Sequence, residues 1–281
     1  MASYVADADL EMHFGQETRL SIGACVRLLS FLQSFEAQGC AVTLRGLLSW
    51  GVGSYLDRIG FFALLGPGVT AARVGTTGRF EDCRGDHPRL VELAPVPVVG
   101  TPDGTLPSRL ADRLAACALP EQRNALAATA FTFFAELTDN IRLHSQSPRP
   151  GLVALQVYSP TVGARRMVEV VVADAGKGIL ETLRPALAFN QPGLAALPDE
   201  ALLLHAVNHG ASRNGAEAGC GITQSARKIL RRVDPDLTLR VPDLRLSLSP
   251  GDSGYAVTDV RRPPALYSLP GTHWVARYAL D

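Results

Sequence analysis

A strand rich in valine constrains the fold of this chain more than any other segment. Residues 167–173 contain four valines, and this density of β-branched residues predicts a strand buried inside a sheet. A long helix is predicted over 120–144, because Pro120 suits the first helical position and apolar residues recur with helical spacing. Shorter predicted elements are strands at 152–158, 237–241, 244–248 and 273–279 and helices at 199–209 and 221–232. Helices and strands in this proportion predict an α/β fold.

The N-terminal segment, residues 1–98, is predicted to form a small α/β domain of its own. Its expected elements are two helices, at 22–37 and 54–62, and a strand at 41–44. A stretch rich in proline and glycine follows at 94–104, and such composition is typical of a boundary between domains. We therefore expect a connector at 99–114 and a second domain at 115–281.

Composition disfavours several classes of protein. The formal net charge is zero and the arginine pairs are scattered, which argues against a broad basic surface for nucleic acid. No apolar stretch approaches the ~18 residues of a membrane span, and the first residues lack the features of a secretory signal. The five cysteines show no C-x-x-C spacing, which favours a reducing compartment over a zinc site or a disulfide framework. We therefore expect a cytoplasmic protein that binds neither nucleic acid nor membranes.

A polar strip runs along the long helix, where Glu136, Asn140 and His144 are spaced four residues apart. At about 100° per residue these three side chains share one side of the helix. The apolar face beside the strip carries Ala130, Phe134, Leu137 and Ile141. A carboxamide oxygen can bind Mg²⁺ and a carboxylate can act as a general base, so the strip suits a site for Mg²⁺ and a nucleotide. The alternative is an ordinary solvated helix face, which is the commoner meaning of such spacing on its own.

A first glycine-rich motif comes directly after the valine-rich strand. It consists of Asp174, Ala175, Gly176, Lys177, Gly178 and Ile179. A carboxylate at a strand end can accept a hydrogen bond from a polar ring edge, while glycines let the backbone approach a ligand closely. The alternative is an Asx-type turn at the end of a strand.

A second glycine-rich motif opens the predicted helix at 221–232 and consists of Gly219, Cys220, Gly221 and Ile222. The free N–H groups of a helix start suit a phosphate, although an ordinary loop leading into a helix looks the same. Just upstream, Ser212 lies in a segment short of large apolar residues, which can close over a nucleotide. Thr272, before the last predicted strand, offers a hydroxyl to a base or a water, but by itself indicates only a turn.

The order of these motifs is more specific than any one of them. Glu-x-x-x-Asn on a helix, Asp-x-Gly-x-Gly-Ile after a strand, Gly-x-Gly-Ile at a helix start and Gly-Thr before a final strand together resemble the GHKL superfamily of ATPases and kinases. The resemblance covers about residues 115–281. It implies the Bergerat fold, a two-layer sandwich of a mixed sheet under helices, with ATP and Mg²⁺ as cofactors.

The resemblance also implies a role for each motif residue. Asn140 would bind Mg²⁺, Glu136 would be the general base, and Asp174 would accept a hydrogen bond from the adenine amino group. Gly176 and Gly178 would permit the close turn of their motif, and Gly219 and Gly221 would hold the phosphates under a lid at 186–218. The other residues implied at the nucleotide are Lys177, Ile179, Ser212, Cys220, Ile222 and Thr272.

Within the superfamily, the sequence around Asn140 is most similar to the anti-sigma-factor serine kinases, in which a histidine also follows the asparagine by four residues. Sensor histidine kinases fit less well, because no phosphoacceptor histidine lies on a predicted dimerisation helix. The N-terminal segment is similar in pattern to STAS domains. We therefore expect phosphoryl transfer, either ATP hydrolysis or phosphorylation of a protein serine or threonine, in a bacterial-type regulatory system. A protein partner or substrate is expected, and a homodimer is compatible. The alternative is a nucleotide-gated interaction module with negligible turnover.

Overall fold

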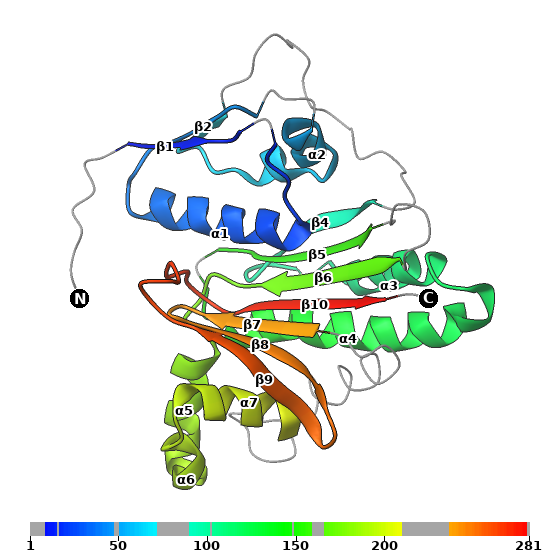
Figure 1. Cartoon of the computed structure of the whole chain (residues 1–281), viewed down its shortest axis with the longest axis vertical. Helices are drawn as coiled ribbons and strands as arrows, with labels where there is room; N and C mark the ends of the chain where they lie inside the picture. Colours follow the sequence, from blue (N-terminus) through cyan, green and yellow to red (C-terminus); the bar gives the residue numbers. More distant parts are fainter. Residues whose placement is uncertain are drawn as a thin grey trace.

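A computed structural model gives the structure of the chain. It describes residues 9–15, 17–47, 51–71, 90–101, 103–147, 149–158, 166–209 and 236–279. Within these ranges the side chains of residues 90–92, 129 and 144 are not described. The α/β class predicted from the sequence is confirmed, since helices pack on a parallel sheet of three strands and a larger sheet of seven (Figure 1).

The larger sheet has the strand order β4-β5-β6-β10-β7-β8-β9. Its strands are β4 (Leu90–Val96), β5 (Gly151–Tyr158), β6 (Met167–Ala173), β7 (Asp236–Val241), β8 (Leu244–Gly251), β9 (Gly254–Arg261) and β10 (His273–Ala279). The valine-rich strand is β6, which pairs with β5 on one side and β10 on the other, so its predicted place inside a sheet is confirmed.

Every pairing in the larger sheet is antiparallel, and the prediction of a mixed sheet was therefore wrong for the described strands. The reason lies in the last strand of the chain. Strands β6 and β7 run in the same direction, but β10 lies between them and pairs with both in the opposite direction. The neighbours β7-β8 and β8-β9 are joined by tight turns that make antiparallel pairs, and β4-β5 and β5-β6 are antiparallel as well.

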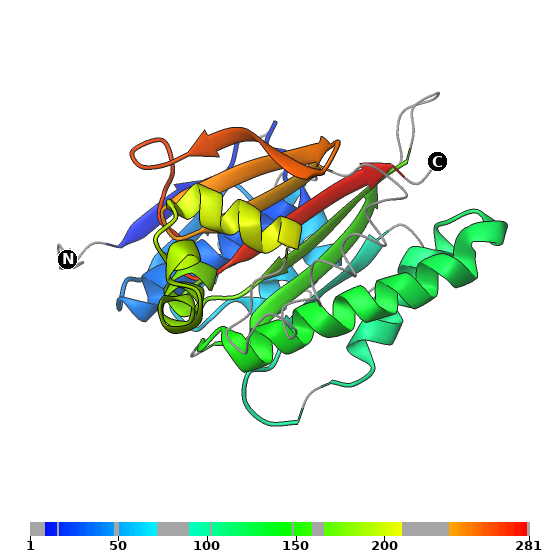
Figure 2. The same cartoon turned by 90° about the horizontal axis from the view of Figure 1, so that it is seen from below.

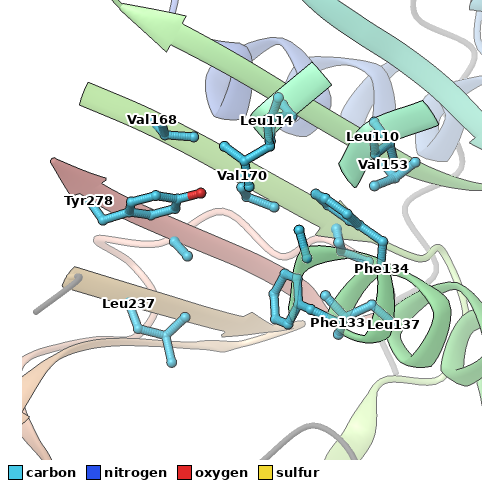
Figure 3. Close-up of a cluster of buried hydrophobic side chains, with 14 of the residues drawn as sticks. Leu110, Leu114, Phe133, Phe134, Leu137, Val153, Val168, Val170, Leu237 and Tyr278 are labelled. Atoms are coloured by element: carbon cyan, nitrogen blue, oxygen red, sulfur yellow. The ribbon is translucent and has the colours of Figure 1, made fainter. Parts of the chain in front are cut away.

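Helices α3 (Leu106–Ala116) and α4 (Arg123–His144) cover one face of the larger sheet (Figure 2). Figure 3 shows the core that they form, with Phe133, Phe134 and Leu137 of α4 against Val170 of β6. Alternate residues of β6 point into this core because successive side chains of a strand face opposite sides. Sheet and helices thus form the two-layer arrangement expected for the C-terminal part of the chain.

The opposite face of the sheet is covered in part by α1 (Ile22–Ala37), which packs on β5 and β6. Its N-terminus is held by Glu169 of β6, whose carboxylate accepts hydrogen bonds from Ser21 Oγ at 3.2 Å and Gly23 N at 3.0 Å. The small sheet lies beyond α1 (Figure 1). Its strands are β1 (Leu10–His13), β2 (Val42–Arg45) and β3 (Val69–Ala71). Helix α2 (Val52–Arg58) and a 3-10 turn (Phe61–Leu64) connect β2 to β3. The N-terminal segment therefore packs directly on the larger sheet.

Two segments near the predicted domain boundary contribute to the C-terminal layer. Residues 90–96, expected to end the N-terminal domain, form β4 and pair with β5. Residues 106–116 form α3, although the sequence placed most of them in a connector, and α3 packs along α4. Both segments bury apolar side chains in the core under the sheet, including Val96, Leu110 and Leu114.

A helical lobe follows β6 and consists of α5 (Ile179–Asn190), α6 (Pro192–Ala195) and α7 (Asp199–His209). It occupies the described part of the segment predicted to be a lid. Helix α7 is fixed to β9, because Asn208 Nδ2 donates to Tyr255 O at 2.9 Å and Tyr255 N donates to Asn208 Oδ1 at 2.7 Å. Across the residues that the structure describes, none of the helices combines the length and apolar character needed to cross a membrane.

Candidate functional site

Helix α4 presents the polar strip and the apolar face as the sequence predicts. Ala130, Phe134, Leu137 and Ile141 are all buried in the core beneath the sheet. Glu136 and Asn140 are half-buried at the edge of this face. The side chain of His144 is outside the described part of the structure. An ordinary solvated helix face would leave both polar residues exposed, and their partial burial favours a site.

One oxygen of Glu136 is buried in an unusual way. Its Oε2 is shielded from solvent and has no hydrogen-bond partner within the described structure. Buried polar atoms nearly always have a partner, because leaving one unsatisfied costs about 1–3 kcal/mol. A carboxylate oxygen in this state is suited to accept a proton or a hydrogen bond from a group that arrives with a ligand.

Asp174 lies at the end of β6 and is held by the backbone on both sides. Its Oδ1 accepts a hydrogen bond from Gly176 N at 2.8 Å, and its Oδ2 accepts one from Thr272 N at 3.2 Å. The backbone of Asp174 also donates to Thr272 O at 3.0 Å. Ile179 N, in turn, donates to Thr272 Oγ1 at 2.9 Å. Four of the predicted residues therefore meet at one turn, although they come from positions almost a hundred residues apart.

Glycines are required where the turn after Asp174 packs against the segment that leads to Thr272. A Cβ on Gly176 would lie closer than 3.0 Å to the carbonyl oxygen of Ser145. A Cβ on Gly271 would lie equally close to the carbonyl oxygen of Asp174, and Gly271 has a φ of +83°. Gly178 also has a φ of +83°, and its Cβ would meet Gly271 O at 3.1 Å. The motif glycines thus permit close backbone packing, as predicted for Gly176 and Gly178.

The same turn contacts the end of α4. Lys177 N donates to the carbonyl oxygen of Ser145, the residue after the helix, at 3.1 Å, while the Lys177 side chain is exposed. At a rise of about 1.5 Å per residue, Asn140 lies about 7.5 Å and Glu136 about 13.5 Å along the helix axis from Ser145. The α4 strip and the Asp174 turn therefore belong to one region. We name this region the α4–Asp174 site, defined by Glu136, Asn140, Asp174, Gly176 and Thr272.

Two residues of this region were not assigned a role from the sequence. The Ser145 carbonyl accepts from Lys177, and Gly271 allows Thr272 to reach Asp174. A backbone carbonyl leaves no trace in a sequence pattern, so Ser145 could not have been found. The Pro270-Gly271 pair before Thr272 is a turn signal that does mark the second position.

The protonation of Asp174 is perturbed by its surroundings. Burial raises the pKa of its carboxyl group, and hydrogen bonds from Gly176 N and Thr272 N partly oppose this rise. Burial disfavours the charged form, whereas donors that point at the carboxylate favour it. A buried carboxylate with one edge held by backbone donors is suited to recognise a ligand N–H group with its remaining lone pairs.

The described residues contain no cluster of three or more His, Cys, Asp or Glu side chains that could hold a metal ion. Asn140 would therefore be an isolated protein ligand for Mg²⁺. Such a set fits this ion, because Mg²⁺ commonly takes only one or two protein ligands and completes its shell with water and substrate phosphates. A metal at Asn140 is consistent with the site only if it arrives with a phosphate-bearing ligand.

The second glycine-rich motif is outside the described residues. Gly219, Cys220, Gly221 and Ile222, together with Ser212, belong to the range 210–235, so their predicted roles stay predictions. Of the predicted site residues, the structure therefore brings together Asp174, Gly176, Ile179 and Thr272, and it places their turn at the C-terminal end of the helix that carries Glu136 and Asn140.

Comparison with known proteins assigns no family to this geometry. No protein-family model, no curated protein and no solved structure matches the chain.

Proposed function

We propose that this chain binds Mg²⁺-ATP at the α4–Asp174 site and acts in phosphoryl transfer. The observation that carries the proposal is the interlocked turn, in which Asp174 accepts from Gly176 N and Thr272 N while Thr272 Oγ1 accepts from Ile179 N. The turn presents a fixed carboxylate next to the helix that carries Glu136 and Asn140. This is the order of groups by which the sequence resembles the GHKL superfamily.

Each group has a distinct proposed role. Asp174 accepts a hydrogen bond from the adenine amino group, and Thr272 fixes the carboxylate and lines the same pocket. Asn140 contributes an amide oxygen to Mg²⁺, which when bound neutralises charge on the phosphates. Glu136, with its unpartnered Oε2, takes a proton from the attacking water or protein hydroxyl. The predicted phosphate-binding residues at 219–222 complete the proposal.

Binding is tested by titrating ATP and Mg²⁺ into the wild type, Asn140→Ala and Asp174→Ala. Asp139→Ala is a matched control, because Asp139 adjoins Asn140 on α4 but is exposed and pairs with Arg142 at 3.2 Å. We expect at least a tenfold loss of affinity in the first two variants and none in the control, since a charge-assisted hydrogen bond contributes about 1.5–3 kcal/mol. Equal affinity in all four proteins would show that the site is misassigned.

The rival function is a nucleotide-gated interaction module with negligible turnover. It is separated from phosphoryl transfer by Glu136→Gln, which removes the base and keeps the shape of the side chain. Loss of a general base lowers turnover by roughly 10²–10⁴-fold without a matching loss of ATP affinity. If the wild type already shows no phosphate release and no labelled protein product, the interaction module is the better description.

The cysteines bear on the cellular location of the protein. Cys25 and Cys40 are buried free thiols, Cys117 is also buried, and the remaining two cysteines are outside the described residues. Free buried thiols are typical of proteins that stay in a reducing compartment, so we propose a cytoplasmic location. A protein partner or protein substrate is part of the same proposal, and size measurements with and without ATP would reveal a homodimer.

A further inference from the structure

A row of arginines crosses the larger sheet on the face that carries α1. Register pairs His273 of β10 with Arg240 of β7, Arg240 with Arg245 of β8, and Arg245 with Arg261 of β9. These residues alternate with the core residues of their strands and therefore point away from α3 and α4. Like charges placed directly opposite one another destabilise a sheet, so folding alone does not account for this row.

Arg240 is the most unusual member of the row. Its side chain is only 8% exposed, and its Nε and Nη2 atoms are buried with no hydrogen-bond partner in the described structure. The Nε of Arg245 is in the same state. Burial, together with the positive charges of Arg27 and Arg245, lowers the pKa of Arg240 to about 10. Buried guanidinium groups are normally paired with an anion.

The nearby acids do not balance these charges. Five guanidinium groups, those of Arg27, Arg240, Arg245, Arg261 and Arg277, interact with three carboxylates, those of Glu169, Asp243 and Asp259. Asp259 pairs with Arg245 and Arg261, at 2.9 Å each, and Glu169 pairs with Arg277 at 3.3 Å. Among the described residues, the exposed Asp243 is the one acid that acts on the pKa of Arg240. Within this part of the chain two positive charges therefore remain unbalanced, while His273, whose pKa burial lowers to about 4, stays neutral near pH 7.

Two hydroxyl groups lie beside the row. Thr238 and Ser247 are direct cross-strand partners, each two residues along its strand from Arg240 or Arg245 and on the same face. Both are half-buried. Arg27 belongs to α1, which packs on β5 and β6; burial lowers the pKa of its guanidinium, Glu169 opposes this, and the charges of Arg277 and Arg245 add to the lowering. Three elements thus direct cationic and hydroxyl donors to one area beside α1.

We propose that Arg27, Arg240 and Arg245, with Thr238 and Ser247, form a binding site for a phosphate-monoester dianion. A dianion supplies the two missing charges, and its oxygens match the planar forks of several guanidinium groups. We name this the arginine site. It lies on the opposite face of the sheet from α4, and the proposal does not depend on ATP binding at the α4–Asp174 site.

Thermal unfolding of the full chain in inorganic phosphate tests the proposal, with sodium chloride at equal ionic strength as the reference. We expect phosphate to raise the Tm of the wild type by several degrees in a saturable way. Arg27→Gln and Arg245→Gln should weaken this effect at least tenfold, and Ser247→Ala should weaken it less. Arg45→Gln removes one charge from an exposed pair with Glu11 and is the control, which should behave as the wild type.

The Tm of Arg240→Met should differ from that of the wild type in both buffers. In chloride its Tm should exceed that of the wild type, because an unpaired buried charge is replaced by an apolar side chain of similar length. In phosphate the added stabilisation should be absent. Succinate carries a dianionic charge without the phosphate geometry, and O-phosphoserine distinguishes a phosphate ester from the free ion. A larger rise in Tm with either phosphate form than with succinate supports the proposal. An equal effect of succinate, or equal phosphate stabilisation of the wild type and Arg240→Met, overturns it.

Discussion

Substitution of Gly271 by alanine tests the geometry of the α4–Asp174 site most directly. Gly271 has a φ of +83°, and its added Cβ would lie closer than 3.0 Å to the Asp174 carbonyl oxygen. The left-handed conformation costs an alanine about 1–2 kcal/mol. Relief of the contact requires the backbone of either segment to move, which costs about 1–3 kcal/mol more. We therefore expect Gly271→Ala to lower the free energy of unfolding by about 2–5 kcal/mol.

Gly100→Ala separates the two contributions. Gly100 has a φ of +87°, but nothing lies within 4 Å of its added Cβ. This control carries the conformational cost alone, about 1–2 kcal/mol. Urea unfolding followed by circular dichroism gives both values under the same conditions. The variant at Gly271 should also lose ATP affinity, because the displaced oxygen belongs to Asp174, the residue that we propose binds the adenine.

Equal destabilisation by the two substitutions would refute the reasoning. It would mean that the Asp174 and Gly271 segments separate at no cost, so that the interlocked turn does not restrain the carboxylate. Normal ATP affinity in a clearly destabilised Gly271→Ala would be just as damaging. In that case the turn would contribute to stability and not to nucleotide recognition.

Three further predictions concern charged groups. Burial lowers the pKa of His273 from 6.5 to about 4 in the folded chain, so on acidification the unfolded chain takes up the proton first. The free energy of unfolding, measured by urea titration, should therefore fall by about 3 kcal/mol as the pH drops from 6.5 to 4, and His273→Gln should remove this loss. Glu169→Gln should lower the free energy of unfolding by about 1–3 kcal/mol, because Arg277 loses its charged partner and the N-terminus of α1 loses the carboxylate that accepts from Gly23 N. Glu11→Gln is the control, because it removes only an exposed ion pair and should change stability little. Burial raises the pKa of Asp174 above its ordinary value of 3.8, and the protonated carboxyl group has one acceptor fewer. Adenosine affinity should therefore begin to weaken on acidification at a pH above 3.8, and a pH-independent affinity in calorimetry would contradict this.

Much of the fold follows from local patterns in the sequence. The helix predicted at 22–37 is α1 with the same bounds, and the apolar face predicted for α4 is the buried one. Strands β5, β6, β7 and β10 also occur where apolar density predicts them. These elements are predictable because each buries one side against a core, and burial imposes a period on the sequence.

Elements that bury little left a weaker signal. Strand β9 is an edge strand in which no side chain is fully buried, so its sequence carries no apolar alternation of the usual strength. Strand β4 contains Pro95 and runs into the stretch that we read as a connector. Its pairing with β5 depends on residues almost sixty positions away, and no local pattern encodes such a partner.

The same limit applies to the two sites. The residues of the Asp174 turn were named from their motifs, but the contact of Thr272 with Asp174 is a product of strand order. The arginine row was not predicted, and the scattered arginine pairs of the sequence were taken only as evidence against a broad basic surface. Arg240 and Arg245 face each other only because β7 and β8 pair in one register, and a shift by a single residue would separate them.

Each face of the larger sheet holds an ionisable side chain with buried atoms that have no hydrogen-bond partner within the described residues. On the α4 face this is Glu136 Oε2, and on the α1 face it is the guanidinium of Arg240. Replacing either by an apolar side chain of similar size would remove a desolvation cost, so neither is explained as a contribution to stability. The charges are opposite in sign and call for opposite ligands: a proton donor at Glu136 and an anion at Arg240. Strand β6 borders both regions, with Asp174 directly after its end and Glu169 on its α1 side.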